Sequence, residues 1–176
     1  IVMHMQNPHI PAMHFNTRYI CTTQNWFGGG MDVTPSIKDK KEEKNFHLSL
    51  KKMCNRHNKK YYKRYKEWCD KYFYLPHRSE ARGIGGIFFD YKKNNFERDF
   101  KFVRDVGVTF QMIFNNIIEK KINKKWTLKD KEMQYIKRGR YAEFNLLYDR
   151  GTKFGLQTGG NVEGILMSLP PIAKWK

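Results

Sequence analysis

The segment Ala12–Ile20 places the strongest constraint on the fold, because its side chains alternate with the period of a β-strand. One face is mainly apolar and carries Met13, Phe15, Thr17 and Tyr19. The other face is polar and carries His14, Asn16 and Arg18. The apolar face predicts burial against a hydrophobic core. The row of imidazole, amide and guanidinium groups needs a separate explanation, and we interpret it as the wall of a binding cleft.

Helical patterns occupy the middle of the chain. Apolar residues recur at intervals of three and four across Phe96–Ile118, which predicts the clearest helix. Two shorter stripes consist of Phe46, Leu50, Met53, Cys54 and His57, and of Tyr62, Tyr65, Cys69 and Tyr72. Thr127 and Asp130 resemble a capping box that would begin a helix ending near Lys137.

Strand-forming segments lie on both sides of these helices. Trp26–Gly30 predicts a strand that ends in a glycine turn, and Thr34-Pro35 suits the entry of a helix. Gly86–Asp90 is a short β-prone run, and Arg140–Asp149 alternates like a strand that continues into Phe154–Leu156. Strands at both ends and helices between them predict an α+β fold with an antiparallel sheet.

Length and composition exclude several classes of protein. The 176 residues suffice for one domain with a core, and the 40% apolar content excludes intrinsic disorder. No apolar run approaches the roughly 20 residues that a membrane span requires. The three cysteines, Cys21, Cys54 and Cys69, form no CxxC pair, which favours a reducing compartment.

The net charge predicts an anionic partner. Lys and Arg number 34 against 17 Asp and Glu, which gives +17. This excess suits nucleic acid, a membrane surface or a polycarboxylate substrate. Tyr61–Lys66 interleaves aromatic and basic residues as a nucleic-acid platform does, but helical spacing assigns Tyr62 and Tyr65 to the core stripe. A solvated exterior is therefore the simpler interpretation of the lysines.

Three arginines lie next to glycines, where a guanidinium can approach a ligand closely. They are found in Arg82-Gly83, Gly139-Arg140 and Asp149-Arg150-Gly151. Together with Arg18 they predict a cleft for several carboxylates, because the planar guanidinium binds a carboxylate through two parallel hydrogen bonds. The alternative interpretation is a set of turns with local ion pairs.

These segments belong to four collinear blocks that resemble oxygen-dependent coproporphyrinogen III oxidase. The blocks are HFNTRY at 14–19, WFGGGMDVTP at 26–35, RGIGGIFFD at 82–90 and GRYAEFNLLYDRGTKFGLQTGGNVEGILMS at 139–168. The resemblance extends from Ile1 to Trp175 and implies a single domain, residues 1–176, without the family's N-terminal third and C-terminal helix. It implies a flat antiparallel sheet flanked by helices on both sides. It also implies a homodimer formed through about Tyr141–Pro171.

The resemblance implies a late step of haem biosynthesis. Members of the family oxidatively decarboxylate the ring A and ring B propionates of coproporphyrinogen III to vinyl groups, which gives protoporphyrinogen IX. Molecular oxygen is the co-substrate, and no organic cofactor takes part. The expected location is the cytoplasm or the mitochondrion. The alternative for the same fold is a basic module that binds RNA or a membrane surface.

The resemblance also assigns catalytic residues. His14 matches the histidine that serves as proton donor in the family. Asp32 and Asp149 match acidic residues of its cleft, where a carboxylate can stabilise an oxidised pyrrole.

The implied substrate contacts come from both ends of the chain. They are Asn16, Thr17, Arg18, Arg150, Gly159, Gly160 and Asn161. This chain departs from the family at Thr17, where tyrosine is usual, and at Asn161, where arginine is common. We expect Arg18 and Asp149 to face one cavity, with Arg150 at its edge.

Bacterial members of the family are described with a divalent metal on four histidines. The matching positions are His4, His14, His47 and His77. None of the six histidines shows HxxxH or HExxH spacing, so such a site would require distant segments to converge. Exposed or capping histidines are the alternative.

Overall fold

The central feature of the structure is an antiparallel sheet of four strands in the order β1–β2–β3–β6. The computed structural model describes residues 1–176, and the strands of this sheet are β1 (Val2–Met3), β2 (Ala12–Ile20), β3 (Trp26–Thr34) and β6 (Gly86–Lys92). A separate two-stranded sheet joins β4 (Tyr74–Leu75) to β5 (Glu80–Ala81) through a 3-10 turn over Pro76–Arg78. The strands predicted in the 12–20 and 86–90 segments are confirmed.

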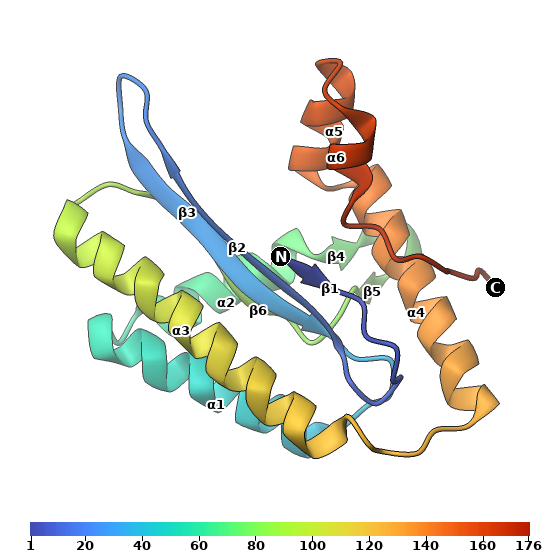
Figure 1. Ribbon diagram of the computed structural model, residues 1–176. Helices are drawn as coiled ribbons and strands as arrows, with labels where there is room; N and C mark the ends of the chain where they lie inside the picture. Colours follow the sequence, from blue (N-terminus) through green and yellow to red (C-terminus); the bar gives the residue numbers. More distant parts are fainter.

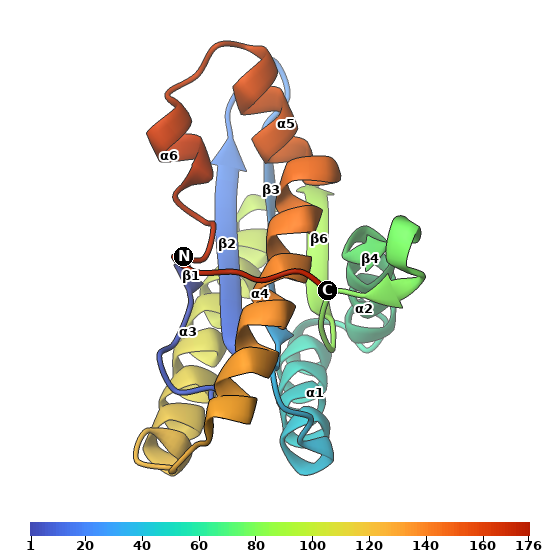
Figure 2. The same cartoon turned by 90° about the vertical axis from the view of Figure 1, so that its right-hand side faces the viewer.

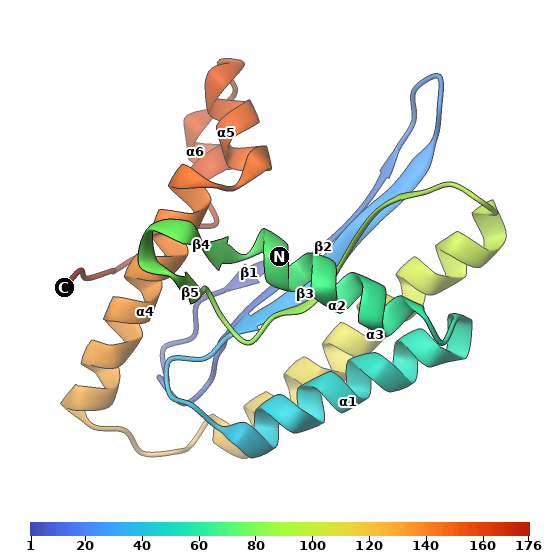
Figure 3. The same cartoon turned by 180° about the vertical axis from the view of Figure 1, so that it is seen from behind.

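Helices lie on both faces of the sheet (Figures 1 and 2). α1 (Lys40–His57) and α3 (Phe96–Lys121) cover one face, and α4 (Leu128–Leu147) crosses the other. α2 (Tyr61–Tyr72) packs along β6, next to the β4–β5 hairpin (Figure 3). The two remaining helices are α5 (Arg150–Gln157) and α6 (Val162–Leu166). None of these helices combines the length and the apolar content needed to cross a membrane. The predicted α+β class, a flat antiparallel sheet with helices on both sides, is confirmed.

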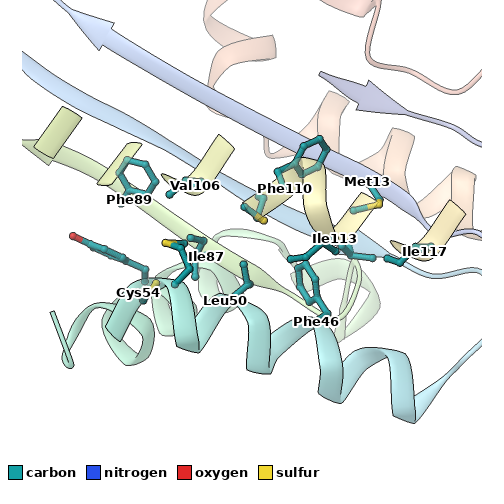
Figure 4. Close-up of a cluster of buried hydrophobic side chains, with 14 of the residues drawn as sticks. Met13, Phe46, Leu50, Cys54, Ile87, Phe89, Val106, Phe110, Ile113 and Ile117 are labelled. Atoms are coloured by element: carbon teal, nitrogen blue, oxygen red, sulfur yellow. The ribbon is translucent and has the colours of Figure 1, made fainter. Parts of the chain in front are cut away.

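The apolar face of β2 packs against the helices, as its alternation predicted. Met13 is 1% exposed and joins the stripes of α1 and α3 in the main core (Figure 4). Its buried neighbours in that core include Phe46, Leu50, Met53, Cys54, Ile87, Phe89, Phe102, Val106, Phe110, Ile113 and Ile117. The three-and-four spacing read from the sequence therefore identifies the surface that the helices bury.

The glycine triplet lies inside a strand, so the predicted glycine turn is wrong. β3 continues through Gly28–Gly30 to Thr34 because it is an inner strand, paired with β2 on one side and β6 on the other. Gly29 has a φ of +152°, and a Cβ atom there would collide with the carbonyl of Asn16, so the close approach of β2 requires glycine. Helix α1 also begins later than predicted, because its N-cap is Asp39 and not Thr34.

Helix α4 is longer than its sequence suggested. The predicted capping box is confirmed, since Thr127 accepts from the backbone of Asp130 and the Asp130 carboxylate accepts from the backbone of Thr127. The helix then continues to Leu147 and does not end near Lys137.

The last third of the chain is helical, so the strand predicted over Arg140–Asp149 is wrong. Tyr141, Phe144 and Asn145 are buried, and their spacing of three and four places them on one helix face. The predicted continuation, Phe154–Leu156, lies in α5. All strands of the protein therefore lie in its first 92 residues.

A buried ion pair fastens α3 to the end of β6. The Nζ atom of Lys92 lies 2.9 Å from Oδ1 of Asp99, and the two side chains are 6% and 1% exposed. Lys92 also donates a hydrogen bond to the hydroxyl of Tyr61 at 3.1 Å. The pair therefore ties together the sheet, α3 and the start of α2.

Replacing Asp99 by Asn should lower the free energy of unfolding by about 3 kcal/mol, because the ammonium of Lys92 would stay buried without its counter-charge. Urea denaturation at pH 7 measures this loss. Glu132→Gln is the matched control, since it removes the same charge from an exposed pair with Lys174 and should cost less than about 1 kcal/mol. Equal losses in the two variants would contradict the role given to the buried pair.

Candidate active site

The polar face of β2 continues onto β3. His14 pairs with Asp32, Asn16 with Gly30 and Arg18 with Gly28 in the antiparallel register. Residues paired in this way project to the same side of a sheet. This face is the one that α4 crosses, and it lies opposite the main core (Figure 2).

His14, Asp32 and Arg82 form a chain of hydrogen bonds that runs into the interior. Nδ1 of His14 lies 2.8 Å from Oδ1 of Asp32, whose Oδ2 accepts from Nη2 of Arg82. The side chains of Asp32 and Arg82 are nearly inaccessible, whereas 28% of the His14 side chain is exposed. Since the carboxylate can only accept, Nδ1 of His14 carries the proton and Nε2 is left to face solvent or a ligand.

The charges in this chain stabilise each other. Burial alone would raise the pKa of Asp32, but the Arg82 guanidinium and the contact with His14 outweigh it and hold that pKa below its ordinary value. For Arg82, burial alone would lower the pKa, but the Asp32 carboxylate outweighs burial and raises that pKa above its ordinary value. The guanidinium carbon lies 4.0 Å from the ring centroid of Phe73, 4.6 Å from that of Tyr141 and 4.7 Å from that of Phe144. Asp32 therefore stays ionised, and its position is fixed.

A second ion pair crosses the same face above β3. Nη2 of Arg18 on β2 lies 2.7 Å from Oδ2 of Asp90 on β6, and Nη1 donates to Asn16 at 3.1 Å. Trp26 donates its indole N–H to Asp90 at 3.1 Å. A Cβ atom on Gly28 would lie 2.5 Å from Oδ1 of Asp90 and 2.8 Å from Cζ of Arg18. Glycine at this position therefore gives the bridge the space to cross the strand.

Thr17 lies apart from its predicted partners. It pairs with Gly29 and, by strand alternation, projects to the opposite face from Asn16 and Arg18. Its side chain is exposed.

Asp149 caps a helix and does not end a strand. Its carboxylate accepts from the backbone N–H of Thr152 at 2.8 Å, from the Thr152 hydroxyl at 2.9 Å and from the hydroxyl of Tyr72 at 3.0 Å. Arg150 is exposed, and its guanidinium lies 5.9 Å from the Tyr72 ring centroid. The alternative of an Asp149–Arg150 ion pair is therefore not realised; every group bound to the Asp149 carboxylate is neutral.

The predicted contacts Gly159, Gly160 and Asn161 form the exposed turn between α5 and α6. Gly159 has a φ of +71°, which suits a glycine. Asn161 is the N-cap of α6, and its Oδ1 accepts from Gly164 at 3.2 Å. The backbone of this turn is therefore set locally, by caps.

The structure does not bring the four candidate metal ligands together. His4 and His47 hydrogen-bond to carbonyls of Ser168 and Ile84, each at 2.9 Å, and His14 bonds to Asp32. His77 lies between Tyr148 and Glu143. No group of three or more His, Cys, Asp or Glu side chains is arranged to hold a metal ion. These histidines do not fit a shared ion, and we derive no step through one.

The sequence prediction gave Arg82 a wrong role and missed Asp90. Arg82 was expected to line a cleft for substrate carboxylates, but it is buried and pairs with Asp32, which lies 50 residues away. Asp90 ends the RGIGGIFFD block and gave no local sign of its pairing with Arg18. Only the register of β3 with β6 could have identified these partners.

Comparison with known proteins covers the whole chain. Residues 1–176 match the family described as "Coproporphyrinogen III oxidase". The chain is 56% identical over 176 residues to oxygen-dependent coproporphyrinogen-III oxidases of Rickettsia rickettsii (strain Sheila Smith) and Rickettsia bellii (strain OSU 85-389), and 54% identical to that of Rickettsia akari (strain Hartford). Each alignment includes 99% of this chain and 63% of the relative, so the chain spans less than two thirds of these proteins.

The setting of His77 generates a prediction about acid stability. Arg78 donates to Glu143 at 2.6 and 3.1 Å, and His77 lies 2.9 Å from the same carboxylate. The hydrogen bond from Arg78, followed by that from His77, lowers the pKa of Glu143 from 4.5 to about 2. Ionised Glu143 therefore stabilises the fold above pH 4.5, and this contribution disappears as the pH falls toward 2.

Glu143→Gln should therefore destabilise the protein at pH 7, and its difference from the parent protein should shrink as the pH falls from about 4.5 to about 2. Urea unfolding at a series of pH values measures the difference. Glu119→Gln, at an exposed position without an ion pair, should give a small difference that hardly changes with pH. A constant difference for Glu143→Gln would contradict the assigned pairing.

Proposed function

Because the chain belongs to the coproporphyrinogen III oxidase family, we propose that it forms the catalytic face of an enzyme that oxidatively decarboxylates coproporphyrinogen III. The propionates of rings A and B become vinyl groups, and the product is protoporphyrinogen IX, a haem precursor. The observation that carries this proposal is the buried His14–Asp32–Arg82 chain beside the Arg18–Asp90 bridge. Oxygen as co-substrate agrees with the "oxygen-dependent" names of the relatives.

The proton balance gives His14 a role. Each propionate loses a proton from its β-carbon, its carboxylate leaves as carbon dioxide, and two electrons pass to O2. Oxygen takes up two protons to become hydrogen peroxide, so one proton must be supplied for each vinyl group formed. Nε2 of His14 has no hydrogen-bond partner in the protein, so it can take up a proton from solvent and pass it on, while the bond from Nδ1 to Asp32 holds the ring in place.

Asp32 acts as a positioning residue in this proposal. Both of its oxygens are engaged, and its side chain is only 4% exposed, so direct contact with a pyrrole is not the role that this setting supports. Its charge orients His14 and fixes the tautomer.

Arg18 is the proposed clamp for a propionate. The Asp90 carboxylate and the Asn16 amide hold its guanidinium on the open face of β2, and N–H groups that face neither partner can bind a substrate carboxylate. The other proposed substrate contacts, which follow the family pattern, are Asn16, Arg150, Gly159, Gly160 and Asn161; Thr17 is left out because it projects to the opposite face of the sheet. Asn161 lacks the positive charge that the family commonly has there, so Arg18 and Arg150 would supply the cations.

Asp149 is the proposed source of negative charge for the oxidised pyrrole. Its partners Thr152 and Tyr72 are neutral, so its charge is not cancelled by an adjacent cation. A fixed carboxylate stabilises positive charge that develops during oxidation.

The decisive experiment uses the full-length protein that contains this chain. The protein is loaded with coproporphyrinogen III without oxygen, oxygen is then admitted, and vinyl product and carbon dioxide are measured. We expect equal amounts of vinyl groups and carbon dioxide. RNA binding with a steep salt dependence, and no oxygen-dependent turnover, would instead favour the basic binding module.

We also propose a homodimer built on Tyr141–Pro171. This segment exposes a group of large apolar side chains, which include Leu146, Leu147, Phe154, Leu156, Val162 and Met167. Exposed apolar groups of this kind are typical of protein interfaces.

Asp149→Asn should reduce turnover more than substrate affinity, because asparagine preserves the helix cap but removes the charge. Steady-state kinetics and a melting curve measure both effects. Thr152→Val is the matched control, since it removes one hydrogen bond to Asp149 and keeps the carboxylate. If Asp149→Asn lowers thermal stability and leaves turnover per folded molecule unchanged, Asp149 has only a structural role.

Phe154→Lys should shift the full-length protein from dimer to monomer in sedimentation at micromolar concentration, because a charge would enter the proposed apolar interface. Phe100→Lys is the control, since Phe100 is also exposed but lies outside this segment. A parent protein that sediments as a monomer would refute the dimer.

A further inference from the structure

Tyr91 has a backbone conformation that is unusual for a large side chain. Its φ is +53°, in the left-handed region that favours glycine. The register of β3 with β6 shifts at this point, so Asp90 and Tyr91 together lie opposite the single residue Gly28. They therefore form a β-bulge. Bulges redirect side chains and are common beside active sites, so the strained backbone at Tyr91 suggests a role for its ring.

The bulge connects an aromatic pair to the ion pair of the candidate site. The ring of Tyr91 stacks on that of Trp26, with the centroids 5.3 Å apart and the planes at 29°. Oδ1 of Asp90 accepts from the indole N–H of Trp26 at 3.1 Å and from the backbone N–H of Tyr91 at 3.0 Å. Oδ2 of the same carboxylate lies 2.7 Å from Nη2 of Arg18. One carboxylate thus joins the aromatic pair to the proposed propionate clamp.

Packing of the core does not account for this aromatic pair. Neither ring belongs to the two clusters of buried apolar side chains, and Tyr91 is 64% exposed. A ring that stays in water gains little from the hydrophobic effect, and its left-handed backbone is unfavourable. A ligand that covered the ring would bury this apolar surface and supply the missing contact.

The chemistry of the proposed substrate fits both the ion pair and the aromatic pair. Two methylene groups join each propionate of coproporphyrinogen III to a pyrrole, which is a flat, electron-rich ring. A propionate held by Arg18 therefore keeps its pyrrole close to the side chains that share Asp90 with Arg18. We propose that Tyr91, supported by Trp26, packs against this pyrrole and positions it for reaction. The inference rests on the proposed function and adds a contact for the ring to those for the carboxylates.

Tyr91→Gly in the full-length protein separates this role from a structural one. Glycine accepts the left-handed backbone, so relief of strain should offset the lost stack and the melting temperature should not fall. Loss of the ring should raise KM for coproporphyrinogen III, and its dissociation constant measured without oxygen, by about fivefold or more, with a smaller change in kcat. Tyr91→Phe keeps the ring and should restore most of the affinity.

Ser79→Gly is the matched control for the relief of strain. Ser79 has a φ of +50° and lies between β4 and β5, so glycine there relieves the same kind of strain and should leave KM unchanged. If the parent protein turns over the substrate and Tyr91→Gly keeps the parent's KM and dissociation constant, the role given to Tyr91 is refuted and the proposed function stands. A parent protein without turnover would overturn the proposed function, and this inference with it.

Discussion

The ion pair between Asp32 and Arg82 is the interaction on which both the candidate site and the packing of α4 depend. A buried pair recovers its desolvation cost only when further contacts satisfy both partners. His14 completes the carboxylate on one side. The rings around the guanidinium are those of Phe73, Tyr141 and Phe144. One pair thus joins the sheet to α4 and fixes the orientation of the imidazole.

Strand β2 explains how a small domain holds polar chemistry next to a core. Its alternation sends Met13 into the core and His14 to the opposite face, one residue apart. Because the core residues hold β2 in place, the polar side chains on its other face are attached to a rigid backbone. Arg18 gains a further constraint from Asp90, and the absence of a side chain at Gly28 makes that pairing possible. The candidate site is therefore preorganised by backbone register more than by loops.

The spacing of apolar residues predicted the helices and strands that depend on neighbours along the chain. It failed for segments whose conformation depends on residues distant in the sequence. Ala12–Ile20 and Phe96–Ile118 are long enough for one period to dominate, and both are confirmed. Arg140–Asp149 is short, and its apolar residues fit both strand alternation and the helical spacing of three or four. Packing against the sheet therefore determines that this segment is helical. The glycine triplet likewise predicts a turn when the sequence is considered alone, because its place inside a strand depends on the pairing of β6 with β3. The partner of Asp32 required knowledge of the same pairing.

Because the last third of the chain is helical, the proposed function gives Asp32 and Asp149 different roles. On a strand, Asp32 and Asp149 would have been equivalent sources of negative charge for an oxidised ring. Instead, Arg82 neutralises the charge of Asp32, and only the orientation of His14 remains for it to supply. Asp149 caps α5 through neutral partners, so it keeps an uncompensated charge in a fixed position. Under the proposed function, electrostatic stabilisation of a cationic intermediate would therefore fall to Asp149, and proton supply to His14 positioned by Asp32.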